Sequence, residues 1–442
     1  MSELGSRSFR FKALWLLLAA AFVMALPAMR GDVLEYDDMA LLAGDDGALA
    51  RAPSSFFSDT YYYAYLPFYG LSYWADGKAG GSIEDPRLFH IANVLWHAAA
   101  CYLLFLLLAR LLGRAGPALV GALVFAVHPL HVESVAWIAG RKDVMSGAFF
   151  FLAWLLHLRA EEGRGGARAL SILVFWVACF SKASAIVLPA VLLCAAWWLP
   201  RYDGRRKVAV IDVIPMLCAA LLPFAVHLFI ATEKGVLSDS LPMGERAMAA
   251  VVSWGGTLQR TFAPVNLSAY YPETNAGSAS ALVVPGAILA AAFAALLMTR
   301  KRAPWIAFGL AAFFAAMLPF NNVFPATDVL AADRYAYLPL LGFAAAAAWL
   351  ASRRFQLQVG LVVAAIALAA LSFWSAGRFR SDTALWTATI AARPDAAQAH
   401  ISRGVIVTTD ALRSQPADAA ALERGVGDLR AGLLRARLDA HR

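Results

Sequence analysis

The sequence predicts an all-α protein that crosses the membrane many times. Hydrophobic residues make up 61% of its 442 residues and charged residues only 15%, and its mean hydropathy is +0.62. Such a composition is typical of polytopic helical membrane proteins. Lys and Arg also occur in compact clusters between apolar segments. The positions of these clusters, rather than the net charge of +8, indicate how the chain is oriented in a membrane. We therefore expect membrane lipids rather than nucleic acid around the chain.

Apolar segments recur along the whole chain and predict about 11 transmembrane helices. The four cysteines all lie inside such segments, so they are expected to be reduced packing residues. The segments are 11–30, 91–112, 117–138, 144–158, 169–181, 184–199, 208–231, 281–299, 304–320, 335–351 and 356–375.

Basic clusters separate alternate pairs of these segments, whereas the long loop 31–90 contains few cations. Because cytoplasmic loops are rich in Lys and Arg, the amino terminus is expected in the cytoplasm and the carboxyl terminus outside, in a bacterial inner membrane. Segment 169–199 has basic clusters at both ends, which favours a hairpin of two short arms. Segment 247–271 is expected to lie along the membrane or to re-enter it.

A carboxylate pair, Asp37 and Asp38, follows the first apolar segment. Charged groups at the edge of the hydrocarbon usually face water and mark a functional site. Because adjacent side chains point in different directions, only one of them is expected to meet a substrate. We predict that Asp37 is a general base and that Asp38 orients the site or binds a divalent cation, Mg or Mn, although the sequence requires no metal. The pair Asp45/Asp46 is interpreted as solvated loop.

Four cations lie on the expected outer face, although Lys and Arg are usually concentrated on the cytoplasmic face. They are Arg141, Lys142, Lys182 and Arg334. Each alone could be an interfacial anchor whose charged end reaches the head groups. Together they favour a site for an anion, and a phosphate bound by charge-assisted hydrogen bonds is the natural candidate.

Four further residues are predicted to contact substrate: His128, His131, Glu133 and Tyr335. The two histidines could alternatively make structural hydrogen bonds or bind a metal, but only Glu133 lies near as a further ligand. Aromatic residues in loop 31–90 could stack on a sugar or form an interfacial belt. They are Tyr61, Tyr62, Tyr63, Tyr65, Phe68 and Tyr69.

Several tracts resemble the transmembrane and tetratricopeptide-repeat O-mannosyltransferases, which belong to the GT-C class of membrane glycosyltransferases. They are HPLHVESVAWIAGRKD at 128–143, YDD at 36–38, FSK at 180–182, NLSAYYP at 266–272 and ADRYAYLPLLG at 332–342. The resemblance runs from about residue 12 to 404. It implies a GT-C-like helical bundle whose first large outer loop contains the catalytic acids, a polyprenyl-phosphate sugar as donor, and inversion at the anomeric carbon.

The chain departs from this family at two places. Where members often have Arg-Pro-Leu in the first outer loop, this chain has Tyr65-Leu66-Pro67, and where an acid usually follows Ser-Lys, it has Ala183. The resemblance divides the chain into a membrane domain, 1–379, with its catalytic loop at about 31–90, and a short tetratricopeptide-like helical tail, 380–442. About 60 residues hold at most one or two repeats, so the tail is expected to pack on the membrane domain or to be loosely ordered.

The sequence thus predicts a membrane glycosyltransferase that moves a sugar, with a mannose-like hexose favoured, to a hydroxyl of a protein or glycan on the outer face. No glycine-rich phosphate loop is present, so the activated substrate must arrive in the membrane. Two alternatives remain open: a transporter or flippase for a lipid or glycan, and an inactive scaffold of the same fold.

Overall fold

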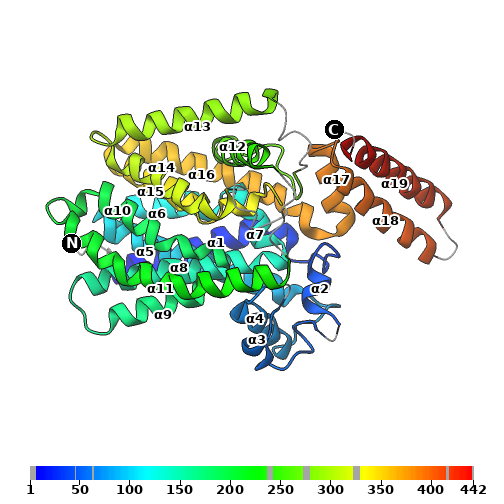
Figure 1. The fold of residues 1–442 in the computed structure, drawn as a ribbon, viewed down its shortest axis with the longest axis horizontal. Coiled ribbons are helices and arrows are strands. Elements are labelled where there is room, and N and C mark those ends of the chain that lie inside the picture. Colours follow the sequence, from blue (N-terminus) through cyan, green and yellow to red (C-terminus); the bar gives the residue numbers. More distant parts are fainter. Residues whose placement is uncertain are drawn as a thin grey trace.

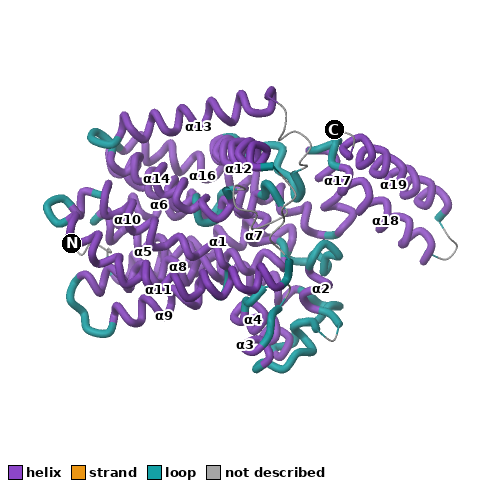
Figure 2. The backbone as a smooth tube through the Cα atoms, in the orientation of Figure 1, coloured by secondary structure: helices purple, strands orange, loops and turns teal. Residues whose placement is uncertain are grey.

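The computed structural model consists of helices and connecting loops (Figures 1 and 2). It describes residues 6–44, 46–61, 64–235, 242–271, 279–321, 329–414 and 418–440. No strand occurs within these ranges, which confirms the predicted all-α class.

Six helices in the described ranges are long and apolar enough to cross a membrane. They are α1 (Arg7–Ala25, extended by the 3₁₀ turn η1, Leu26–Ala28), α5 (Arg87–Leu112), α8 (Arg141–Glu161), α11 (Arg206–Glu233), α13 (Ala279–Thr299) and α16 (Phe355–Ala376). A bent pair could form a seventh span, with α6 (Ala115–Ala126) followed by η2 (Pro129–His131) and α7 (Val132–Ala136) at 54°. Length and composition thus support six or seven spans, fewer than the predicted 11.

Four shorter apolar helices lie beside these spans in Figure 1. They are α9 (Ala167–Cys179), α10 (Leu188–Trp198, preceded by η4, Ala183–Val187), α14 (Pro304–Met317, followed by η7, Leu318–Phe320) and α15 (Leu340–Arg353). The region 169–199 therefore forms two helices joined at 180–187, as predicted. Each is shorter than the roughly 20 residues of a full span, which is why length alone does not count them as crossings.

The spans divide into an interior and a rim. In α5 and α8, 56% and 78% of the apolar window is buried, whereas the values for α11, α13 and α16 are 17%, 6% and 22%. Large apolar side chains on the rim helices remain exposed, such as Phe229, Val283 and Ile366. Apolar surface of this extent is expected where lipid is the solvent. Between interior helices, backbones approach closely at small residues: a Cβ on Gly342 would lie 2.1 Å from the Gly309 carbonyl oxygen.

Short helices gather at the end of the bundle opposite the amino terminus (Figure 1). They are α2 (Asp38–Leu42), α3 (Ser55–Ser58), α4 (Pro67–Lys78), η3 (Ile138–Gly140), η8 (Asp333–Ala336) and η9 (Gly377–Arg380), together with α7. At the amino-terminal end lie the loops between α8 and α9, between α10 and α11 (with η5, Pro200–Tyr202), and between α13 and α14. These loops and the adjoining helix ends contain three basic clusters: Arg159/Arg164/Arg168, Arg201/Arg205/Arg206/Lys207 and Arg300/Lys301/Arg302.

Helix α12 (Met243–Phe262) runs across the bundle, and Figure 1 draws it nearly end-on. It is not among the candidate spans. Segment 247–271 therefore adds no candidate span, and its position along the membrane or as a re-entrant segment stays a prediction.

The C-terminal tail contains α17 (Asp382–Ala392), α18 (Ala397–Arg413) and α19 (Ala419–Ala440). Helices α18 and α19 form a hairpin that projects from the bundle (Figure 1). The Arg403 guanidinium contacts the Asp428 carboxylate at 2.7 Å within this hairpin. Helix α17 packs on the bundle instead, and its Trp386 is only 3% exposed.

Candidate functional site

The two acids of the first loop have different environments. Asp38 is fully buried at the start of α2, and its two carboxylate oxygens accept backbone N–H groups of Leu34 at 3.2 Å and Ala139 at 2.8 Å. Burial outweighs these bonds and raises the pKa of Asp38 to about 8. Asp37 immediately precedes α2 and is partly exposed. Asp38 therefore fixes the loop to η3, and Asp37 is the acid that solvent or a substrate can reach.

Arg141, the first residue of α8, is surrounded by protein. Its side chain has no exposed surface and pairs with Asp76. The guanidinium also donates to Asn93 Oδ1 at 2.8 Å and to the Phe89 carbonyl at 2.9 Å, and it lies 4.1 Å from the centre of the Tyr73 ring. These contacts tie α8 to α4 and α5. They do not favour the predicted contact of Arg141 with a phosphate.

Lys142, the next residue, faces a different environment because a helix turns by about 100° per residue. Its ammonium lies 5.9 Å from the centre of the Tyr69 ring, and within the described residues it makes no ion pair or hydrogen bond. The charges of Arg334, Lys182 and Asp37 all act on it. Lys142 is thus the predicted cation that keeps its donors available, and it lies close to the accessible acid.

Lys182 and Arg334 are each paired with an acid and are slightly exposed, at 14% and 11% of the side chain. Lys182, in the turn between α9 and η4, forms an ion pair with Asp143 of α8. In η8, the Arg334 backbone N–H donates to Glu133 Oε2 at 2.9 Å and the guanidinium pairs with Glu133 Oε1. Burial alone would lower the pKa of Arg334, but Glu133 outweighs it and raises that pKa above its ordinary value.

An aromatic sandwich borders the same site. The Tyr36 ring stacks on Trp137 with centroids 5.1 Å apart, and the Arg334 guanidinium lies 5.5 Å from the Trp137 ring centre. Burial raises the pKa of Tyr36 to about 12, so its hydroxyl stays protonated near neutral pH. The site therefore combines one accessible acid, three cations and a planar aromatic wall.

The remaining predicted residues have structural partners. His128 Nε2 contacts the Thr261 carbonyl at 3.0 Å, and His131 is fully buried with Nδ1 2.7 Å from the Phe125 carbonyl. The Tyr335 hydroxyl donates to the Val329 carbonyl, and its ring stacks on Phe320 at 4.1 Å. These contacts correspond to the structural alternative considered for the histidines.

Some predictions concern metals or residues outside the described ranges. Within the part of the chain that the structure describes, no group of three or more His, Cys, Asp or Glu side chains is arranged to hold a metal. Asp45, Tyr62, Tyr63, Pro272 and Asn322 lie outside the described residues.

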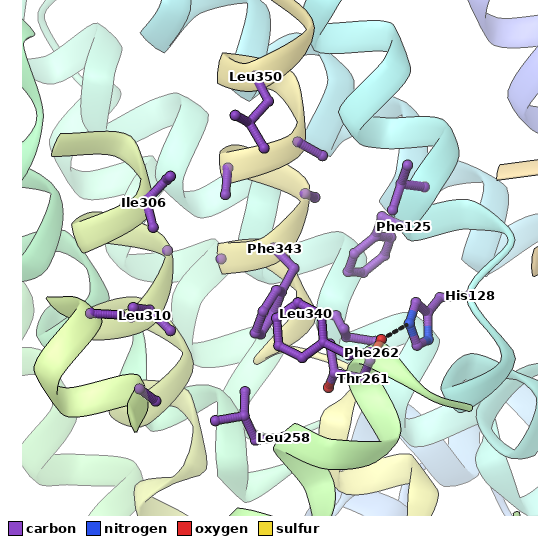
Figure 3. A pocket seen from close by; sticks show the side chains of 18 of the residues that line it. Phe125, His128, Leu258, Thr261, Phe262, Ile306, Leu310, Leu340, Phe343 and Leu350 are labelled. Atoms are coloured by element: carbon purple, nitrogen blue, oxygen red, sulfur yellow. Dashed lines mark hydrogen bonds between the residues drawn. The ribbon is translucent and has the colours of Figure 1, made fainter. Parts of the chain in front are cut away.

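An apolar cavity of about 590 Å³ lies between α6, α12, α13, α14, α15 and α16 (Figure 3). Phe125, Leu340 and Phe343 project into it, and the His128–Thr261 hydrogen bond closes one end. Helix α15, whose first turn lines the cavity, begins four residues after η8, which contains Arg334. The turn that contains Arg334 and a helix that lines the cavity are therefore neighbours along the chain.

Comparison with known proteins gives partial matches. The chain is 34% identical over 188 residues to protein O-mannosyl-transferase Tmtc1 of Drosophila melanogaster, covering 40% of this chain and 21% of that protein. It is 33% identical over 159 residues to tmtc2 of Xenopus laevis (33% of this chain, 19% of that protein) and 27% identical over 205 residues to TMTC3 of Homo sapiens (41% and 22%). The chain is a distant homologue of the TMTC O-mannosyl-transferases. The matches span about a fifth of those relatives' length. No family model and no solved structure matches the chain.

The two departures from the TMTC pattern lie close together. The Tyr65 ring, where an Arg-Pro-Leu tract is expected, packs edge-on against Phe180 at 5.5 Å, two residues before Lys182. Ala183 opens η4, so Lys182 has no acid beside it in sequence and pairs with Asp143 of α8 instead. The acid that Lys182 contacts is thus remote from it in sequence.

Sequence reasoning did not assign a second cluster on the far side of Arg334. Asp333 accepts a hydrogen bond from the Tyr271 hydroxyl at 2.6 Å and lies 3.3 Å from Arg260 Nε. Burial raises the pKa of Asp333 above its ordinary value, against the nearby arginines. Both Tyr271 and Asp333 belong to tracts that resemble the TMTC family, and this resemblance was the signal that could have identified them.

Proposed function

We propose that the protein is a membrane glycosyltransferase that transfers mannose from a polyprenyl-phosphate donor to a hydroxyl acceptor at the end of the bundle where α2, η3 and η8 meet. The observation that supports this most directly is that the charges of Asp37, Lys182 and Arg334 all act on Lys142. In addition, α15, the helix that follows η8, lines an apolar cavity. The names of the homologous TMTC proteins favour mannose as the sugar.

The cations suit a leaving phosphate. Within the described residues the Lys142 ammonium has no hydrogen-bond or ion-pair partner, and Lys182 and Arg334 add positive charge from two other elements. Charge-assisted hydrogen bonds to a phosphate are roughly twice as strong as neutral ones. We assign Arg141 to the framework of this site, because all its surroundings are protein.

The apolar cavity suits the lipid part of the donor. Its walls are almost entirely aliphatic and aromatic, and it opens among the spans, where a polyprenyl chain would lie. A donor anchored there would present its phosphate near Arg334, because η8 leads directly into the wall helix α15.

The proposed reaction is a single inverting displacement. The acceptor oxygen forms a bond to the anomeric carbon while the bond from that carbon to the phosphate oxygen breaks. Asp37 takes the acceptor's proton, and the electron pair of the broken bond leaves with the lipid phosphate, whose charge Lys142, Lys182 and Arg334 stabilise. Both oxygens of Asp38 already accept backbone donors, so we assign it to positioning Asp37 and give no step to a metal.

The proposed topology has 11 crossings, made of the seven candidate spans and the four shorter apolar helices. It places the amino terminus in the cytoplasm, and the site and tail outside, as the basic loops at the opposite end of the bundle favour. The membrane would be the bacterial inner membrane, and the acceptor a protein or a glycan.

Transfer by purified protein in lipid nanodiscs tests the proposal. A polyprenyl-phosphate mannose should yield a mannosylated hydroxyl acceptor with inverted anomeric configuration. Asp37→Asn should lower the rate by a factor of about 10²–10⁴, as expected for loss of a general base. Asp46→Asn, an exposed acid of the same loop, is the matched control and should keep full activity. A folded Asp37→Asn protein with wild-type activity would refute the assignment, and lipid movement without transfer would support the transporter instead.

A further inference from the structure

The 3₁₀ turn η9, which directly precedes α17, is joined by its backbone to the segment that leads to Asp37. The Asp32 N–H donates to the Arg380 carbonyl at 2.9 Å. The two backbone segments also approach closely at Gly31, where a Cβ would lie 2.9 Å from the Phe379 carbonyl oxygen. The start of the tail and the start of the catalytic loop therefore form one packed unit.

Two side chains of α17 extend this contact toward the acid. Both carboxylate oxygens of Asp382 accept the Glu35 backbone N–H at 3.1 Å. The Trp386 indole packs edge-on against Tyr36 with centroids 5.2 Å apart, so Tyr36 lies between Trp386 and Trp137. The two residues before Asp37 are thus each held by a residue of the tail.

The residue after Asp37 is held from the other side, because Asp38 is bonded to the Ala139 N–H. The backbone on one side of Asp37 is therefore held by the bundle, through Asp38, and on the other side by the tail, through Glu35 and Tyr36. Displacement of a reacting group by about 1 Å can cost a factor of about 100 in rate. The tail anchor is consequently placed where it can affect transfer without touching substrate.

The same helix reaches the cation side of the site. Arg393, which follows α17, lies 4.9 Å from the centre of the Tyr271 ring, and Tyr271 donates to Asp333, the neighbour of Arg334. Helix α17 thus borders both the acid half and the cation half of the site.

We propose that Asp382 and Trp386 are positioning residues for Asp37, so that α17 is a working part of the transfer site rather than the first element of a separate tail domain. The inference rests on the proposed function for its kinetic consequence. Its structural consequence, the immobilisation of residue 37 by α17, is independent of any activity.

The kinetic test uses the full-length protein in nanodiscs. Trp386→Ala and Asp382→Ala should lower kcat by about ten- to 100-fold, while the Kd for polyprenyl-phosphate mannose stays within about twofold of wild type, because neither residue faces the cations. Trp386→Phe retains an aromatic edge and should restore most of kcat. Gln398→Ala removes an exposed hydrogen bond to Ser402 within α18 and should behave as wild type. Wild-type kcat in Trp386→Ala, or equal losses of kcat and donor affinity that Trp386→Phe does not restore, would overturn the proposal.

The activity-independent test places a spin label on Asp37→Cys after replacement of the four native cysteines by serine. The label should be immobilised in the parent and in Gln398→Ala, and mobile in Trp386→Ala. An equally immobile label in Trp386→Ala would refute the positioning role even if transfer were confirmed. A mobile label together with an inactive wild type would instead refute the proposed function and leave the positioning of residue 37 standing.

Discussion

Arg334 occupies both carboxylate oxygens of Glu133, one with its backbone N–H and the other with its guanidinium. The two residues are 201 positions apart, and both are largely buried. The pair therefore joins η8 to α7 and fixes the direction in which the remaining guanidinium donors of Arg334 point. Stability and anion binding depend on the same pair, and a double-variant cycle separates them.

We expect Glu133→Gln and Arg334→Gln each to lower the free energy of unfolding by about 3–5 kcal/mol, because each leaves its partner as an unpaired buried charge. The double variant should recover much of this loss, since no net charge stays buried. It should still bind polyprenyl-phosphate mannose poorly. Denaturation in mixed micelles and donor binding measure the two effects. A double variant less stable than both single variants would show that the pair does not act through charge compensation.

Loss of charge at Lys142 should affect donor binding, whereas loss of charge at Arg141 should affect stability. Lys142→Gln should weaken donor binding by about 1.5–3 kcal/mol while the melting temperature stays unchanged, because Lys142 has no ion pair or hydrogen bond within the described residues. Arg141→Gln should lower the melting temperature, because Asp76 and Asn93 lose a buried partner. Titration with a polyprenyl-phosphate sugar and thermal denaturation distinguish them. Weaker donor binding in a stable Arg141→Gln protein would return Arg141 to the phosphate site.

This contrast shows where sequence reasoning stops. Composition and apolar length are sufficient to predict a helical membrane fold, because burial in lipid imposes them on every span. The adjacency of Asp37 and Asp38 is also sufficient to predict that the two acids divide into an accessible and an inaccessible one. The sequence does not reveal which cation of Arg141-Lys142 faces the site, because Asp76, a residue 65 positions earlier, decides it.

Contacts between residues that are remote in sequence also explain why the role of the tail next to Asp37 was not predicted. Its short length predicts packing on the bundle or loose order, but neither a charge pattern nor a repeat places Asp382 on the Glu35 N–H, 347 positions away. The number of crossings was uncertain for a related reason. Helices as short as α9 and α10 are stabilised by neighbouring helices as much as by their own apolar length.

The buried acid Asp38 should make stability depend on pH. Because its folded pKa is raised to about 8 from 3.8, the neutral form stabilises the fold. This contribution is fully present below about pH 4 and is lost as the pH rises to about 8, at up to about 1.4 kcal/mol per pH unit. The melting temperature of the wild type in detergent should therefore fall more steeply between about pH 5 and pH 8 than that of Asp38→Asn. Asp46→Asn should keep the wild-type slope, and identical slopes in all three proteins would contradict the prediction.

The proposed topology predicts which positions an impermeant thiol reagent reaches in intact spheroplasts. In a background without native cysteines, Asp46→Cys and Ser414→Cys should be labelled from outside. Lys207→Cys and Lys301→Cys should be labelled only after the membrane is opened. Lys207 is in the first turn of α11 and Lys301 is in the loop between α13 and α14, and both elements begin or end at the amino-terminal end of the bundle. Outside labelling at Lys301→Cys would mean that the count of crossings before α14 is wrong, and the proposed face of the site with it.

Filling the apolar cavity should raise the KM for donors that have a long polyprenyl chain. Ala346 lines the cavity on α15, and Ala346→Phe would occupy part of its 590 Å³. The KM for a donor with a full polyprenyl chain should rise by about tenfold, equal to about 1.4 kcal/mol, because the chain loses apolar contact there. A short-chain analogue, whose lipid part does not extend into the cavity, should keep its KM. Val363→Phe on the rim of α16 adds the same ring where the side chain is already 60% exposed, and it should change neither value. If Ala346→Phe raised both KM values equally, the ring would be acting on the sugar-phosphate site, and the cavity would not be the place where the lipid chain binds.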